Sequence, residues 1–175
     1  ETTTVKVTKK WEDNNDSAQK RPKAIKIQLK NIAAIVQEQK LEGTGNEWNY
    51  TFKNISKYNN YGEIINYTVD EIEENTEDLK FYTKEITGTK EQGYVITNKF
   101  TVPEDKINIK VNKVWEDNSN SQNKRPESIK YILKNGNKNI QEQVIKGNNK
   151  TDEDWSYEFK DLAKYDQNAK EINYI

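Results

Sequence analysis

The sequence predicts an all-β protein, built as an antiparallel β-sandwich that is present in two tandem copies. Apolar and polar residues alternate over a series of short segments, and turn residues separate these segments, as expected for strands with one buried face. An internal repeat supports the division into two copies. The stretch Val5-Lys6-Val7-Thr8-Lys9-Lys10-Trp11-Glu12-Asp13-Asn14 returns as Ile109-Lys110-Val111-Asn112-Lys113-Val114-Trp115-Glu116-Asp117-Asn118.

The first copy divides into strands that alternate with loops. We expect strands at residues 1–12, 25–29, 32–39, 48–52, 64–73, 81–87 and 94–101. Turn chemistry marks the connections after Glu12 and after Glu42, where Asn, Asp, Ser and Gly accumulate. The charged stretch 73–80 is interpreted as a loop rather than as a helical turn.

The repeat also predicts the domain boundaries. We assign residues 1–102 to a complete domain, residues 103–106 to a linker that begins with Pro103, and residues 107–175 to a second domain. The two copies match at a constant offset of 104 residues until the turn near Gly147, which is three residues longer in the second copy. The second copy stops at the counterpart of Tyr67, so we expect it to be truncated at its C-terminal end.

Composition narrows the range of functions. The 175 residues include 28 basic and 29 acidic side chains, a formal net charge of −1, which does not point to nucleic acid or to an anionic membrane surface as a partner. There is no Cys, His or Met. Disulfides and thiol chemistry are therefore excluded, and the commonest metal ligand and general base is missing. We expect no metal and no cofactor.

Three polar residues of the first copy occupy positions where the alternation calls for a core residue. Lys9 follows Val5 and Val7 in phase, and Lys113 repeats this placement in the second copy. Glu71 and Asn98 occupy such positions in their own strands, in phase with the residues Ile65, Tyr67 and Val69 and with Tyr94, Ile96 and Phe100. A buried ammonium group is costly, so such a lysine shifts its pKa, finds a partner or reacts.

An amine, a carboxamide and a carboxyl group are together the components needed to make an amide bond. Burial disfavours charge, so Lys9 would tend to be a neutral nucleophile and Glu71 a protonated acid. Glu71 could then hydrogen-bond the Asn98 carbonyl oxygen and pass a proton to the departing ammonia. The fold would supply proximity and orientation without a cofactor.

Several motifs in a fixed order resemble the Cna B-type domain, the repeat module of Gram-positive collagen adhesins and related surface proteins and pilins. They are the Lys-x-Trp-Glu-Asp opening at Lys9 and at Lys113, the Lys-Arg-Pro steps at Lys20 and Lys124, and the segments Trp48-x-Tyr-x-Phe52, Tyr67-Thr-Val-x-Glu71 and Ile96-Thr-Asn98. The resemblance covers residues 4–101 and the second copy as far as it extends.

This resemblance implies an inverse immunoglobulin-like (prealbumin-like) sandwich with an autocatalytic isopeptide bond between its first and last strands. Carried onto this chain, the bond joins Lys9 to Asn98, and Glu71 is the acid that transfers the proton. Lys113 is the corresponding lysine of the second copy, but its Glu and Asn partners are not in this sequence, so we expect no bond there. Self-crosslinking of this kind happens once per molecule, so the protein is not expected to be an enzyme.

Each candidate also has a simpler interpretation. Lys9 could be an edge-strand lysine that extends to water, Glu71 a solvated residue at a strand end and Asn98 a turn residue. The four Trp residues could form a carbohydrate platform, although core packing is the more common role of one Trp per strand. The loop Asp13-Asn14-Asn15-Asp16 has the composition of a calcium loop but lacks the rest of an EF-hand pattern, so we interpret it as a turn.

From these observations we expect a monomeric stalk or spacer repeat of a bacterial surface adhesin or pilin. Its partners would be neighbouring repeats of the same chain and a ligand-binding tip domain elsewhere in the parent protein. We expect it to be extracellular and anchored to the cell wall through a part of the parent that is not in this chain. The alternatives are a module that itself binds host matrix protein or glycan, and, less favoured, a hydrolase.

Overall fold

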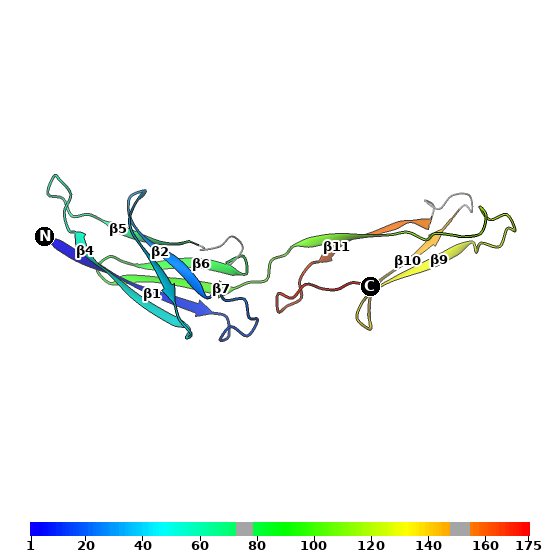
Figure 1. The fold of residues 1–175 in the computed structure, drawn as a ribbon, viewed down its shortest axis with the longest axis horizontal. Helices are drawn as coiled ribbons and strands as arrows, with labels where there is room; N and C mark the ends of the chain where they lie inside the picture. Colours follow the sequence, from blue (N-terminus) through cyan, green and yellow to red (C-terminus); the bar gives the residue numbers. More distant parts are fainter. Residues whose placement is uncertain (73–78, 148–154) are drawn as a thin grey trace. The chain divides into compact units, whose positions relative to one another are not determined.

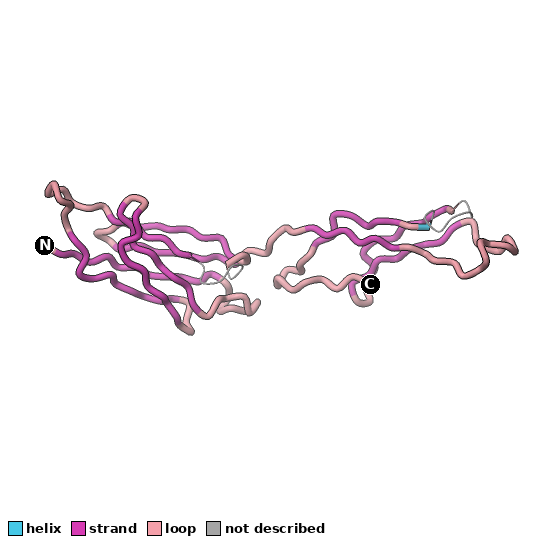
Figure 2. Tube along the Cα trace, turned by 45° about the horizontal axis from the view of Figure 1, so that its top comes forward, coloured by secondary structure: helices cyan, strands magenta, loops and turns pink. Residues whose placement is uncertain are grey.

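The computed structural model describes residues 1–72, 79–147 and 155–175 and divides the chain into two compact units, Glu1–Pro103 (unit 1) and Glu104–Ile175 (unit 2). Strands and their connecting loops account for nearly all of the described residues (Figure 2). No helix in the described ranges is long and apolar enough to span a membrane.

Unit 1 is a sandwich of two sheets (Figure 1). The four-stranded sheet has the order β4-β1-β7-β6, and the three-stranded sheet has the order β3-β2-β5. The strands are β1 (Thr2–Glu12), β2 (Ala24–Asn31), β3 (Ala34–Glu42), β4 (Glu47–Ser56), β5 (Tyr67–Ile72), β6 (Tyr82–Thr89) and β7 (Gly93–Phe100).

Each sheet of unit 1 contributes one apolar face to a shared core. The alternation read from the sequence places the inward side chains correctly: Val5 and Val7 of β1, Ile25, Ile27 and Leu29 of β2, Trp48 and Phe52 of β4, Tyr67 and Val69 of β5, and Ile96 of β7 all pack in one buried cluster. Burying aliphatic and aromatic surface in this way is the main driving force for folding a chain with so few apolar residues.

The first and last strands of unit 1 are neighbours. β1 and β7 pair in parallel, with Lys9 opposite Ile96 and Trp11 opposite Asn98, and they lie side by side in Figure 1. All the other strand pairs of unit 1 among the described residues are antiparallel. The sandwich is therefore antiparallel with one parallel pair, which the sequence pattern did not indicate.

Two expected strands of unit 1 start two or more residues later in the structure. The strand expected at 32–39 starts at Ala34, because Ile32 lies in the hairpin turn with a φ of 56° and a side chain that is 89% exposed. The strand expected at 64–73 starts at Tyr67, and Ile64 makes only an isolated bridge with Tyr58. The loop expected at 73–80 lies mostly outside the described residues.

Unit 2 repeats part of this pattern. The strands are β8 (Lys106–Val111), β9 (Ser128–Asn135), β10 (Lys138–Lys146) and β11 (Tyr157–Ala163), and they form the pairs β10-β9 and β11-β8. Leu133, Phe159 and Leu162 form its buried cluster. β8 ends at Val111, whereas β1 continues to Glu12, so Lys113 and Trp115 lie beyond the strand in which the repeat had placed them.

Candidate functional site

Lys9 lies on an interior strand and points into the core. Its side chain is fully buried, in phase with Val5, Val7 and Trp11, and β1 has a neighbouring strand on each side. The interpretation of Lys9 as an edge-strand lysine that reaches water is therefore wrong. Lysine is almost never fully buried unless it is paired, so the position of Lys9 calls for a partner inside the core.

The structure brings together the three polar residues that the alternation singled out. Lys9 and Asn98 come from the neighbouring strands β1 and β7, and Glu71 reaches them from β5 in the opposite sheet. The Nζ atom of Lys9 lies 3.5 Å from Oε2 of Glu71. The Nδ2 atom of Asn98 donates a hydrogen bond of 2.6 Å to Oε1 of Glu71. Glu71 is 3% exposed and Asn98 is fully buried, so neither is a solvated strand-end or turn residue.

The amine of Lys9 has two further neighbours. It donates a 2.9 Å hydrogen bond to the main-chain oxygen of Lys10, and it lies 3.8 Å from the centre of the Trp11 ring. Burial lowers the pKa of Lys9 to about 8, although the nearby Glu71 carboxylate opposes this shift. At neutral pH a much larger fraction of Lys9 is therefore in the neutral form, which is the nucleophile, than for an exposed lysine.

Glu71 shifts in the complementary direction. Burial raises the pKa of its carboxyl group, and the charge of Lys9 and the hydrogen bond from Asn98 oppose that change. Both shifts favour the neutral forms of the two side chains. Oε2 of Glu71 and Oδ1 of Asn98 are buried without a hydrogen-bond partner, which is costly for an oxygen atom removed from water.

Asn98 presents its amide nitrogen, and not its carbonyl oxygen, to Glu71. The hydrogen bond predicted from Glu71 to the carbonyl oxygen is therefore replaced by one from the amide nitrogen. The observed orientation places the carboxyl group beside the nitrogen atom that would leave as ammonia if the amide were exchanged. The unpartnered Oδ1 is the atom that would gain negative charge during attack on the amide carbon.

Lys113 of unit 2 has the same local surroundings as Lys9 but is only half-buried. Its Nζ atom donates a 2.9 Å hydrogen bond to the main-chain oxygen of Val114 and lies 4.4 Å from the centre of the Trp115 ring. In both units the lysine thus contacts the main-chain oxygen of the following residue and the ring of the tryptophan two residues on. These contacts are a property of the Lys-x-Trp segment itself.

A second lysine near the site was missed by the sequence analysis. Lys84 lies on β6 directly opposite Asn98, and its Nζ atom donates a 2.8 Å hydrogen bond to the main-chain oxygen of Glu71. The signal was present in the sequence, because Lys84 lies in phase with Tyr82 and Ile86, both of which pack against the core. The criterion that found Lys9 would also have found Lys84.

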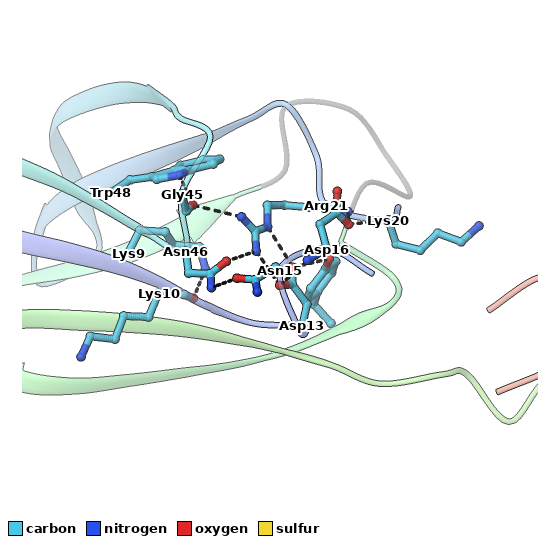
Figure 3. A network of polar contacts seen from close by, with 11 residues as sticks. Lys9, Lys10, Asp13, Asn15, Asp16, Lys20, Arg21, Gly45, Asn46 and Trp48 are labelled. Atoms are coloured by element: carbon cyan, nitrogen blue, oxygen red, sulfur yellow. Dashed lines mark hydrogen bonds and ion pairs between the residues drawn. The ribbon is translucent and has the colours of Figure 1, made fainter. Parts of the chain in front are cut away.

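The loop after β1 is held by a network of polar contacts (Figure 3). Nε of Arg21 donates to Oδ2 of Asp13, and Oδ1 of Asp13 accepts from the amide of Asp16. Oδ1 of Asp16 accepts from the amides of Lys20 and Arg21, both at 2.8 Å. Unit 2 builds the same loop with Asn120, whose Oδ1 accepts from the amides of Lys124 and Arg125.

This network supports the interpretation of the loop as a turn rather than as a calcium site. The acidic oxygens accept hydrogen bonds from the protein itself, and an amide oxygen replaces the Asp16 carboxylate in unit 2 without changing the contacts. Across the described ranges, no group of three or more Asp, Glu, His or Cys residues is arranged to hold a metal ion.

The tryptophans pack in edge-to-face pairs instead of forming a platform, and only Trp115 among the four is half-buried rather than buried. Trp11 and Trp48 are 4% and 5% exposed and meet edge to face with ring centres 5.4 Å apart. Trp115 and Trp155 repeat this arrangement at the same distance, and Trp155 is fully buried. The space beside Trp48 requires glycine at position 43, because a Cβ atom there would come within 2.6 Å of the indole ring.

Comparison with known proteins shows which family the chain resembles. The chain matches the Cna protein B-type domain over residues 5–99 and again over residues 109–175. It is 35% identical to a collagen adhesin of Staphylococcus aureus over 173 residues, which are 98% of this chain and 14% of that protein. The chain thus spans about a seventh of the length of this curated relative.

Solved structures give similar matches. A structure of two B repeat units of the collagen-binding protein of S. aureus is 30% identical, with 99% of this chain and 43% of that chain covered and a TM-score of 0.49. The pilus adhesin SpaC of Lactobacillus rhamnosus GG, in its open conformation, is 16% identical, with 83% and 18% covered and a TM-score of 0.41.

The family match settles the fold class and excludes an enzyme. Domains of this family are immunoglobulin-like structural repeats of adhesins and do not act as enzymes, so the hydrolase alternative is excluded. The two matched ranges together cover most of the sequence. The chain belongs to the Cna protein B-type domain family.

Proposed function

We propose that this chain is a spacer segment of a bacterial surface adhesin, and that an isopeptide bond between Lys9 and Asn98 stabilises unit 1. The observation that carries the proposal is the contact among the buried side chains of Lys9, Glu71 and Asn98. Burying three polar groups, with one oxygen atom of Glu71 and one of Asn98 lacking a hydrogen bond, costs stability, and a reaction among these groups would account for it.

The reaction needs only these three side chains. The neutral Nζ of Lys9 attacks Cγ of Asn98, and the new C–N bond forms as the bond from Cγ to Nδ2 breaks. Glu71, in its protonated form, delivers its proton to Nδ2 and takes up the proton that the amine loses, so ammonia leaves and Glu71 returns to its starting state. Glu71 contacts Nδ2 already, at 2.6 Å, which favours this last proton transfer.

The arrangement of β1 and β7 would let the bond bear mechanical load. β1 and β7 are parallel neighbours, so tension on the two ends of unit 1 would pull them in opposite directions along their length. A covalent link from Lys9 to Asn98 carries that load directly between the two strands. The segment between these residues then lies outside the path of the force, as suits a spacer that must keep its length.

The relatives support the cellular setting. The 35% identical protein is a collagen adhesin far longer than this chain, which agrees with one or more repeats between other parts of an extracellular protein. We infer that the chain functions outside the cell at the bacterial surface, in series with neighbouring repeats and with a ligand-binding domain elsewhere in the parent.

The test is the intact mass of the purified chain under denaturing conditions. We expect a deficit of one ammonia relative to the sequence, which the substitutions Lys9→Ala, Asn98→Ala and Glu71→Gln each abolish. Lys113→Ala is the matched control, because it removes a lysine with the same local contacts and should leave the deficit in place. A wild-type mass equal to that of the sequence would refute the bond.

A further inference from the structure

Lys84 occupies an inward position at the edge of the four-stranded sheet. It pairs directly with Asn98 across the antiparallel strands β6 and β7. Directly opposed residues of an antiparallel pair project from the same face of a sheet. The side chains of Lys84 and Asn98 therefore start from adjacent points on the face that meets the other sheet.

The ammonium group of Lys84 crosses to the opposite sheet and contacts the main chain that carries Glu71. Its Nζ atom donates 2.8 Å to the main-chain oxygen of Glu71 and 2.6 Å to Oδ1 of Asp70. The same Oδ1 accepts the main-chain amide of Glu71 at 2.8 Å. The ion pair of Lys84 and Asp70 thus binds both the main-chain amide and the main-chain oxygen of Glu71.

This connection matters because β5 is an edge strand. Within the described parts of unit 1, β5 pairs with β2 alone, at the end of the order β3-β2-β5, so this strand pairing fixes the position of Glu71 only through β2. Nothing in that pairing relates Glu71 to the sheet that carries Lys9 and Asn98. The contacts of Lys84, which lies opposite Asn98, connect the main chain of Glu71 to that sheet.

We propose that Lys84 is a positioning residue for the formation of the Lys9–Asn98 bond, because it ties the main chain of Glu71 to the strand beside Asn98. This inference rests on the proposed function. Lys84 contacts no reacting atom, so its role is to keep the Glu71 carboxyl group within reach of the Asn98 amide while the amine attacks. A misplacement of about 1 Å in such a group can slow a reaction by up to about 100-fold.

The chain contains a matched control for this role. Lys30 pairs with the other oxygen of Asp70, its Nζ atom lying 2.7 Å from Oδ2. The side chain of Lys30 is 24% exposed and that of Lys84 is 36% exposed, so the two ion pairs are similarly placed at the surface. Lys30 belongs to β2, in the same sheet as Asp70, and its ion pair therefore does not join the two sheets.

The experiment follows bond formation in the full chain as it is made. The chain is synthesised by cell-free translation in a short pulse, samples are denatured at intervals, and the fraction lacking one ammonia is measured by mass. Protease resistance of the same samples gives the folded fraction, so that rates are expressed per folded molecule. The variants are Lys84→Met, Lys84→Arg and Lys30→Met.

We expect Lys84→Met to slow bond formation by about 10- to 100-fold per folded molecule, and Lys30→Met to leave the rate within about twofold of wild type. Lys84→Arg keeps the charge and the N–H donors and should recover most of the rate. A wild-type rate for Lys84→Met, or equal slowing by Lys30→Met, would refute the positioning role while leaving the bond itself established. If the wild-type chain never loses ammonia, both proposals fail.

Discussion

The amine of Lys9 and the carboxyl group of Glu71 lie 3.5 Å apart, and both side chains are completely buried although they come from opposite sheets. Burial pushes the pKa of the lysine down and that of the glutamate up, so each residue is moved toward its neutral form. Asn98 contacts the same carboxyl group, and the three side chains form one polar cluster inside an otherwise apolar core.

A first prediction concerns mechanical extension of unit 1. Pulled from its two ends, the wild-type chain should show no lengthening from the segment between Lys9 and Asn98, because the bond bypasses that segment. Asn98→Ala should release it, with a gain of roughly 3.5 Å for each residue freed. Single-molecule stretching measures both lengths. Equal extension of the two proteins would contradict a load-bearing link.

A second prediction concerns the pH dependence of stability when the bond cannot form. In Asn98→Ala, Lys9 should titrate near pH 8 when folded and near pH 10.4 when unfolded. Between these values the unfolded chain binds more protons, so the free energy of unfolding should rise with pH, by at most about 1.4 kcal/mol per pH unit. Urea unfolding at a series of pH values measures this slope.

The control for that experiment replaces the lysine as well. The double variant Lys9→Met with Asn98→Ala has no titrating group at this position and should lose the rise between pH 8 and 10. If the slope persisted without the lysine, another group would be responsible for it, and the buried amine would not titrate as described.

A third prediction concerns the hairpin between β2 and β3. Ile32 is highly exposed and has a φ of 56°, which a β-branched residue adopts only at a cost, whereas its counterpart Gly136 adopts the same φ without one. Ile32→Gly should stabilise unit 1 by about 1 kcal/mol, measured by urea unfolding. Gly136→Ile should destabilise unit 2, and a stabilising effect of that change would argue against the strain.

A fourth prediction separates charge from hydrogen bonding at Asp16. Because Asn120 makes the same two contacts in unit 2, Asp16→Asn should change the stability of unit 1 little. Asp16→Ala leaves two amide groups without their acceptor and should cost about 1–3 kcal/mol. Added calcium should not shift the urea midpoint of either protein. A calcium-dependent gain that Asp16→Asn abolished would revive the metal-site interpretation.

The pattern of residue types was enough to predict the strands of unit 1, apart from their ends, and the residues that face inward. Alternation has a period of two in any strand, so the phase of Val5 and Val7 was enough to place Lys9 in the core, and the same argument placed Glu71 and Asn98. The repeat then identified the hairpin, loop and tryptophan positions that unit 2 shares. These are local properties, which a pattern of residue types can specify.

Which strands are neighbours depends on contacts between distant parts of the chain. The parallel pairing of β1 with β7 joins residues nearly ninety positions apart, and no local pattern encodes that register. The shorter β8 has the same cause, because among the residues that the structure describes it pairs only with β11, whereas β1 pairs with both β4 and β7. The bridge from Lys84 to the main chain of Glu71 likewise depends on two sheets meeting at one edge, since strand periodicity fixes the face of a side chain but not the partner that it reaches.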